Sequence, residues 1–171
     1  MTKIKETNSI HDDHHDASKQ LDILQSIEES LAQRLDIEQI YELVGEKLQS
    51  HFDATTVVLA SYNADSETVH YPFVVSEGER HSINPHPLSK SFSGQVIRTK
   101  EALLLTSADQ VLEWSTKLNA TGVGKGAKSY LGIPLVLEGE ALGMISLQNV
   151  RREGAFNQED LQLLNILANS M

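Results

Sequence analysis

The most constraining feature of this sequence is a pair of apolar segments joined by a tight turn. The segments are 129–137 (SYLGIPLVL) and 141–150 (ALGMISLQNV), and Glu138-Gly139-Glu140 lies between them. Side chains of different character alternate along the first segment, which gives a strand two distinct faces. Gly139 tolerates the positive φ that a short hairpin turn requires. The chain is therefore expected to build its fold around an antiparallel hairpin.

Other segments supply further strands and helices. Asp36 is a suitable N-cap, because its carboxylate accepts hydrogen bonds from the first turn of a helix. Pro72 cannot donate a ladder hydrogen bond, so its strand is expected at a sheet edge. The long connection 106–128 is expected to be functional or to carry a short helix. The remaining expected elements are helix 37–52, strands 55–62 and 67–75, polar loop 78–87, helix 90–99, strand 101–105 and a helix that follows Asn157. This order predicts an α+β fold with a central antiparallel sheet of about five to six strands and helices on both faces.

Composition limits the possible functions. A length of 171 residues with 40% hydrophobic side chains fits one globular domain. The net charge of −10 argues against binding to nucleic acid or to anionic membranes. No segment has the roughly 20 apolar residues that cross a bilayer, and the polar N-terminus lacks a signal peptide. A cytoplasmic location is therefore expected. The absence of cysteine excludes disulfides, thiolate nucleophiles and cysteine-bound metals.

The N-terminal part divides into two segments before the main domain at 36–171. Residues 1–17 are polar without periodicity and are expected to be a disordered leader. Residues 18–35 form a narrow apolar stripe on a predicted helix, which is too short to be stable alone. We therefore expect this segment to be a dimerisation helix, and we expect a homodimer in which this helix and the apolar C-terminal helix of the domain are buried against a second copy of the chain. The expected interface residues are Leu21, Leu24, Leu31, Leu35, Leu164 and Leu167.

Three sequence stretches resemble the GAF domain family. Residues 129–149 are similar to its closing hairpin, a strand with G-[IV]-P-[LI], a short turn, and then G-x-[LI]-x-[LV]. Residues 156–161 (FNQEDL) resemble the start of its last helix, and 93–96 (SGQV) resemble the start of its pocket-side helix. Together they span roughly 37–170. A PAS domain is the main alternative fold, but a Gly-Ile-Pro-Leu hairpin followed by a capped terminal helix favours GAF.

The resemblance implies a location for a binding pocket. GAF domains carry their N- and C-terminal helices on one sheet face, and short helices and loops cover a pocket on the other. Here, about 88–99 and 106–128 would form that cover. Trp114 is equally consistent with a core anchor of its segment. The ligand-binding residues expected on this basis are Ser91, Phe92, Trp114, Lys128, Ser129 and Tyr130.

The family also suggests a role. GAF domains are sensory modules, so we expect a small molecule to bind the pocket and the dimerising terminal helices to transmit the signal. The resemblance also implies a fused output domain as the recipient of that signal. A ligand-free dimerisation module is the alternative. Enzymatic activity is not expected, because the sulfoxide reductases of this fold use cysteine. A covalently attached bilin is excluded for the same reason. The family's cyclic-nucleotide signature is not found, and the ligand or cofactor stays unidentified.

Two further sequence patterns are weak evidence for a phosphate-binding or metal-binding site. The glycine- and lysine-rich segment 122–129 looks superficially like a phosphate loop, but its spacing differs and a strand follows it. We interpret it as a flexible loop. The histidines and aspartates within 11–16 have side chains that metals prefer, but they lie in the expected disordered leader. No metal site is predicted.

Overall fold

The computed structural model describes residues 36–120 and 126–170, together with Ser18, Leu21, Asp22, 24–26 and Glu29. The chain forms an antiparallel sheet of seven strands in the order β3-β2-β1-β7-β6-β5, and β4 pairs with β2. The predicted α+β class is confirmed. The strands are β1 (Thr56–Asn63), β2 (Thr68–Ser76), β3 (Glu79–Arg80), β4 (His86–Pro87), β5 (Leu103–Leu105), β6 (Ser129–Leu137) and β7 (Glu140–Asn149).

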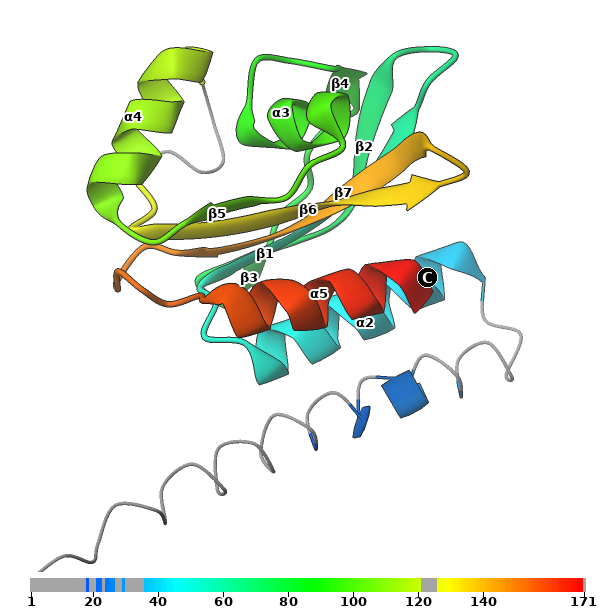
Figure 1. Ribbon diagram of the computed structural model, residues 1–171. Coiled ribbons are helices and arrows are strands. Elements are labelled where there is room, and N and C mark those ends of the chain that lie inside the picture. Colours follow the sequence, from blue (N-terminus) through cyan, green and yellow to red (C-terminus); the bar gives the residue numbers. More distant parts are fainter. Residues whose placement is uncertain are drawn as a thin grey trace, which may run out of the picture.

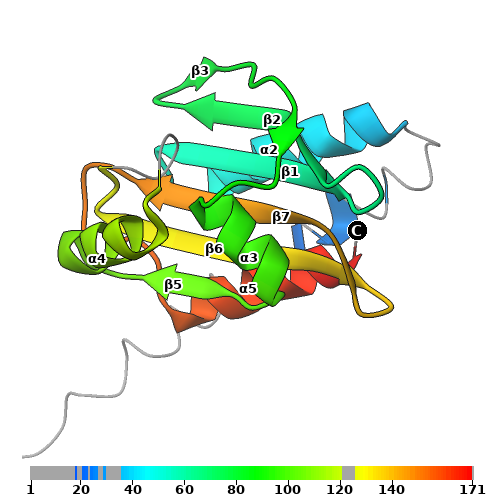
Figure 2. The same ribbon diagram turned by 90° about the horizontal axis from the view of Figure 1, so that it is seen from above.

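The helices cover both faces of the sheet. Helices α2 (Ile37–His51) and α5 (Gln158–Ser170) lie side by side on one face, as Figure 1 shows. Helices α3 (Phe92–Thr99) and α4 (Ala108–Leu118) lie on the other face, which we call the roofed face (Figure 2). This arrangement agrees with the expected layers. Among the described residues, no helix is long and apolar enough to cross a bilayer.

The helix starts follow local side-chain chemistry. Asp36 and Gln39 form a reciprocal capping box: the Asp36 carboxylate accepts the Gln39 N–H at 2.9 Å, and the Gln39 side chain accepts the Asp36 N–H at 3.0 Å. Asn157 accepts the N–H groups of Glu159 and Asp160 at the start of α5. Both caps satisfy amide donors that have no partner within the helix, so both helices begin where the sequence predicts.

The central hairpin also forms as expected. Glu138 and Gly139 have φ values of 51° and 83°, and they connect β6 to β7 as a two-residue turn. Gly143 of β7 lies so close to β1 that a Cβ there would be 2.0 Å from the Ala60 carbonyl oxygen. Only glycine allows these two strands to approach at this position.

Two strands occur where a loop is expected. The short strands β3 and β4 lie within segment 78–87 and pair with the two ends of β2. These two strands form only because β2 is available to pair with them, so the local sequence pattern does not predict them. Pro72 lies between these pairings, beside a register shift, where its missing N–H costs little. The connection 106–128 carries α4, in agreement with the expectation of a short helix.

The main core lies between the sheet and the pair α2 and α5. Leu164 and Leu167 are fully buried there, against β6 and β7. The sheet of the same chain covers these two side chains, which the sequence predicts at a dimer interface. Leu24 packs at the margin of this core, whereas Leu21 is 66% exposed. Leu31, Leu35 and the leader 1–17 lie outside the described residues.

Candidate functional site

The roofed face carries an unusual group of hydrogen-bonding side chains at one end of strands β6, β7, β1 and β2. Cross-strand pairing aligns Tyr130, Gln148, Thr56 and Ser76 in one row, and Ser146 lies opposite Gly132 in the next row. Directly paired residues share a sheet face, so these side chains are neighbours. We call Tyr130, Ser146, Gln148, Thr56 and Ser76 the polar floor. The first four are at most 4% exposed, and none of the five is charged.

Tyr130 is the residue of the polar floor that contacts α3. Its ring is stacked at a tilt on Phe92 of α3, with 4.8 Å between ring centroids. The side chain is fully buried, and its hydroxyl forms no hydrogen bond of normal geometry with any of the described residues, although the Ser146 hydroxyl lies nearby. Burial raises the pKa of this phenol well above its usual value of 10, and the nearby Ser146 hydroxyl only partly opposes the shift. Tyr130 is therefore a neutral side chain with an unused donor, which costs about 1–3 kcal/mol.

Gly132 provides the space for this phenol. A Cβ at position 132 would lie 2.6 Å from the Tyr130 hydroxyl oxygen and 2.8 Å from Cε1 of the ring. Any side chain there would force the ring away from its place over the sheet. The glycine of the Gly-Ile-Pro-Leu sequence therefore sets the position of Tyr130.

The roof packs directly on the polar floor. Ser91 caps α3 by accepting the Gly94 N–H at 3.0 Å, and this cap places Phe92 over Tyr130. Val111 of α4 is buried in the same cluster, and Trp114 and Leu118 pack against it. Lys117 lies over the Trp114 ring, with Nζ 4.4 Å from its centroid. The space directly above Tyr130 is therefore filled by side chains of the roof.

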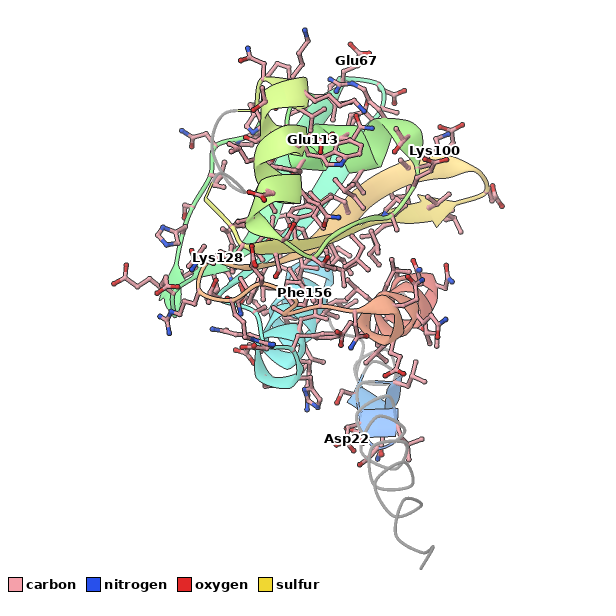
Figure 3. The ribbon with its side chains drawn as sticks, turned by 60° about the vertical axis from the view of Figure 1, so that its left-hand side comes forward. Asp22, Glu67, Lys100, Glu113, Lys128 and Phe156 are labelled. Carbon is pink, nitrogen blue, oxygen red and sulfur yellow. The ribbon has the colours of Figure 1, made fainter. Side chains whose placement is uncertain are left out.

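The expected binding residues do not all meet at this place. The structure brings Phe92, Trp114 and Tyr130 together in one cluster, whereas Ser91 has a structural task as a helix cap. Lys128 is exposed, and its backbone N–H donates to Asn149 (Figure 3). Its side chain is not part of the buried cluster.

Ser129, which the sequence predicts as a ligand-binding residue, forms structural hydrogen bonds in the folded chain. It precedes Tyr130 on β6, so its side chain points to the opposite face. Its hydroxyl donates to the Arg152 carbonyl at 2.8 Å and accepts the Ala155 N–H at 3.1 Å. Because Ser129 is fully buried, these bonds hold the connection between β7 and α5.

The sequence interpretation missed Ser146 and Gln148. A signal existed, because these polar residues alternate with Ile145 and Leu147 along β7. Such alternation normally indicates a face that meets water. Only the packing of α3 and α4 shows that this polar face is buried.

Metal binding finds no support in the described part of the chain. No group of three or more His, Asp or Glu residues is placed there to hold a metal ion. The histidines and aspartates within 11–16, and most of the phosphate-loop-like segment at 121–125, lie outside the described residues.

Comparison with known proteins identifies the family. The GAF domain family model matches residues 36–171, which is most of the chain. The chain belongs to the GAF domain family. This match confirms the resemblance seen in the hairpin and the last helix. A search of the curated proteins finds no significant match.

Solved structures show the same fold at low sequence identity. The GAF domain of an Acinetobacter phosphoenolpyruvate-protein phosphotransferase has 16% identity and a TM-score of 0.67, with 87% of each chain covered. Residues 122 to 287 of a methyl-accepting chemotaxis protein have 17% identity and a TM-score of 0.68, with 86% of this GAF chain and 91% of that chain covered. A substrate complex of free methionine-R-sulfoxide reductase from Neisseria meningitidis has 14% identity and a TM-score of 0.72, with 99% and 92% covered.

Proposed function

We propose that this GAF domain is the sensory domain of a signal-transduction protein and binds a small molecule on the polar floor. The unpartnered hydroxyl of buried Tyr130 carries this proposal. A ligand acceptor would remove the cost of leaving this donor unsatisfied. The polar floor has no charged side chain to compensate a buried charge. The part of the ligand that meets it is therefore uncharged, because an unpaired charge is expensive to desolvate.

Binding requires the roof to move. Phe92, Val111 and Trp114 occupy the space over Tyr130, so a ligand selects a state in which α3 or α4 is displaced. A ligand can shift this equilibrium only through its higher affinity for the displaced state. The proposal therefore includes a conformational change as part of sensing.

The sheet offers a direct route from the ligand to the terminal helices. Tyr130 faces the roof, and its neighbour Leu131 belongs to the core that contains Leu164 of α5. Because successive residues of a strand point to opposite faces, a change in the polar floor moves the contacts beneath it. We propose that α5 and segment 18–35 carry the signal across a homodimer to an output domain.

We propose no catalytic role. The chain has no cysteine, so the thiol chemistry expected of sulfoxide reductases with this fold is not available to it. The polar floor contains hydroxyl groups and an amide, without a carboxylate or imidazole to act as a general base.

A thermal-shift screen tests the sensing role. The panel contains uncharged heterocycles, amino acids, oxo acids, cyclic nucleotides and tetrapyrroles, and a binder raises the melting temperature by mass action. We expect at least one compound with an uncharged hydrogen-bonding edge to stabilise the wild type, and Tyr130→Phe to lose most of that shift. Ser50→Ala, which removes an exposed hydroxyl group on α2, is the control. If no compound stabilises the protein, or if Tyr130→Phe responds like the wild type, ligand sensing at the polar floor is refuted.

A ligand-free dimerisation module is the second candidate. The filled space over Tyr130 and the 66% exposure of Leu21 favour it. Sedimentation velocity measures the mass of the wild type, Leu21→Asp and Leu31→Asp. Leu112→Asp on α4 is a matched control, because Leu112 is also 66% exposed. We expect a dimer that only the first two variants dissociate, and a wild-type monomer would exclude this candidate.

A further inference from the structure

A cavity lies away from the roofed face, at the β2 side of the sheet. It is a groove of about 580 Å³ between the first turn of α2, the ends of β1 and β2, and the loop that follows β3. None of its lining residues belongs to the polar floor. Its volume is in the range of small-molecule sites. The lining residues used below are Ile37, Glu38, Tyr41, His70, Ile83 and Pro85.

A cation is already held beside this groove by the chain itself. The Arg80 guanidinium pairs with the Glu42 carboxylate, donates to the Pro72 carbonyl at 2.7 Å, and lies over the Phe73 ring at 4.1 Å from its centroid. The planar guanidinium thus contacts a carboxylate, a carbonyl oxygen and an aromatic face. This is a favourable set of contacts for guanidinium.

Glu38 provides a second carboxylate on α2, about one helical turn before the Glu42 carboxylate that binds Arg80. Residues four apart lie on the same helix face, so Glu38 follows Glu42 towards the helix start at a distance of about 6 Å along the axis. Glu38 lines the groove and has no hydrogen-bond or ion-pair partner within the described part of the chain. Tyr41 lies beside it, half-buried, and provides an aromatic ring.

The charge of the groove favours a cation. Among the described residues its lining contains no lysine or arginine, and apart from the tyrosines its described ionisable side chains are Glu38 and His70. The nearby charge of Arg80 is compensated by Glu42. The net charge of the whole chain is −10, which also attracts cations.

The rest of the lining requires an apolar part of the ligand. Ile37 is 61% exposed at the rim, and Ile83 and Pro85 form the wall contributed by the loop after β3. We propose that this groove is a second binding site, for a small organic cation of the amidinium or guanidinium class that carries an apolar group. Glu38 binds the charged end, and the isoleucine and proline side chains contact the apolar group.

Benzamidine and benzamide test this proposal as a matched pair. They have nearly the same shape, but only benzamidine is a cation. Amide chemical shifts of the isotope-labelled full chain are followed during titration at pH 8, where an ordinary imidazole is neutral. We expect benzamidine to shift amides of residues 37–41, 61–63 and 70–72, and benzamide to bind at least tenfold more weakly.

Two charge variants complete the test. Glu38→Gln keeps the side-chain shape and is expected to weaken benzamidine binding about fivefold, in keeping with one charge-assisted contact. Glu113→Gln on α4, which removes an equal charge far from the groove (Figure 3), is expected to leave the affinity unchanged. Equal binding of the two compounds, equal effects of the two variants, or no saturable shift at the groove would each overturn the proposal.

Discussion

Gly132→Ala directly tests the link between the hairpin and the polar floor. The new Cβ would lie 2.6 Å from the Tyr130 hydroxyl oxygen, inside the normal contact distance. The ring cannot swing away freely, because Phe92 packs on it with 4.8 Å between centroids. Overpacking of this kind costs about 1–3 kcal/mol. Replacing a strand glycine returns about 0.5–1 kcal/mol, so the middle of the two ranges gives a net loss of stability of about 1 kcal/mol.

Urea unfolding with a double-mutant cycle measures this effect. The free energy of unfolding of Gly132→Ala is expected to fall by about 1 kcal/mol, which in a thermal melt corresponds to a fall of about 2–4 °C in melting temperature. In a Tyr130→Leu background the added methyl group meets no ring, so the same substitution is expected to be neutral or stabilising. The coupling between the two positions should therefore be at least about 1 kcal/mol. Equal penalties in the two backgrounds would refute the reasoning.

Four further perturbations follow from the same contacts. Gly143→Ala places a Cβ 2.0 Å from a backbone carbonyl that cannot rotate away, and we expect a loss of about 3 kcal/mol or failure to fold, measured by urea unfolding. Ser129→Ala leaves the Ala155 N–H without its partner and should cost about 1–3 kcal/mol in the same assay. Asp36→Ala removes the cap of α2 and should cost about 1 kcal/mol, whereas Asp36→Asn should cost less. Burial raises the pKa of folded Tyr130 above 10, so the unfolded chain releases this proton first and stability falls as the pH rises above 10. Tyr130→Phe should show a shallower fall of melting temperature between pH 9 and about 11, and an unchanged slope would contradict the burial of the phenol.

Local chemistry in the sequence was sufficient for much of the fold. Asp36 and Asn157 cap helices because their side chains accept hydrogen bonds from the next few residues of the same chain. The turn at Gly139 depends on φ, which is also a local property. The hairpin and the helix starts were therefore predictable without knowledge of the rest of the molecule. The motifs at 93–96, 129–149 and 156–161 indicated the GAF family by resemblance.

The short strands required the assembled sheet. Strands β3 and β4 have two residues each and carry no periodicity of their own. They form because β2 presents unpaired backbone groups at both of its ends. The same reason explains the tolerance of Pro72, since its environment depends on which neighbours pair beside it.

The candidate site was predictable only in part. Phe92, Trp114 and Tyr130 were expected together, and the structure places them in one cluster. The sequence predicts Ser129 in the same group, because the sequence alone does not assign adjacent strand residues to one sheet face or the other. The strand alternation separates Ser129 from Tyr130, but only the packed helices identify which face is roofed. Ser146 and Gln148 were missed for the same reason.

The apolar helices show most clearly what sequence and tertiary structure each decide. The spacing of Leu164 and Leu167 shows by itself that these side chains must be removed from water. It does not identify the surface that covers them, because hydrophobic burial has no preferred direction or partner. In the folded chain the underside of β6 and β7 covers them completely. The secondary-structure elements and their apolar faces thus follow from the sequence alone. Which helix face contacts which sheet face depends on how the whole chain packs.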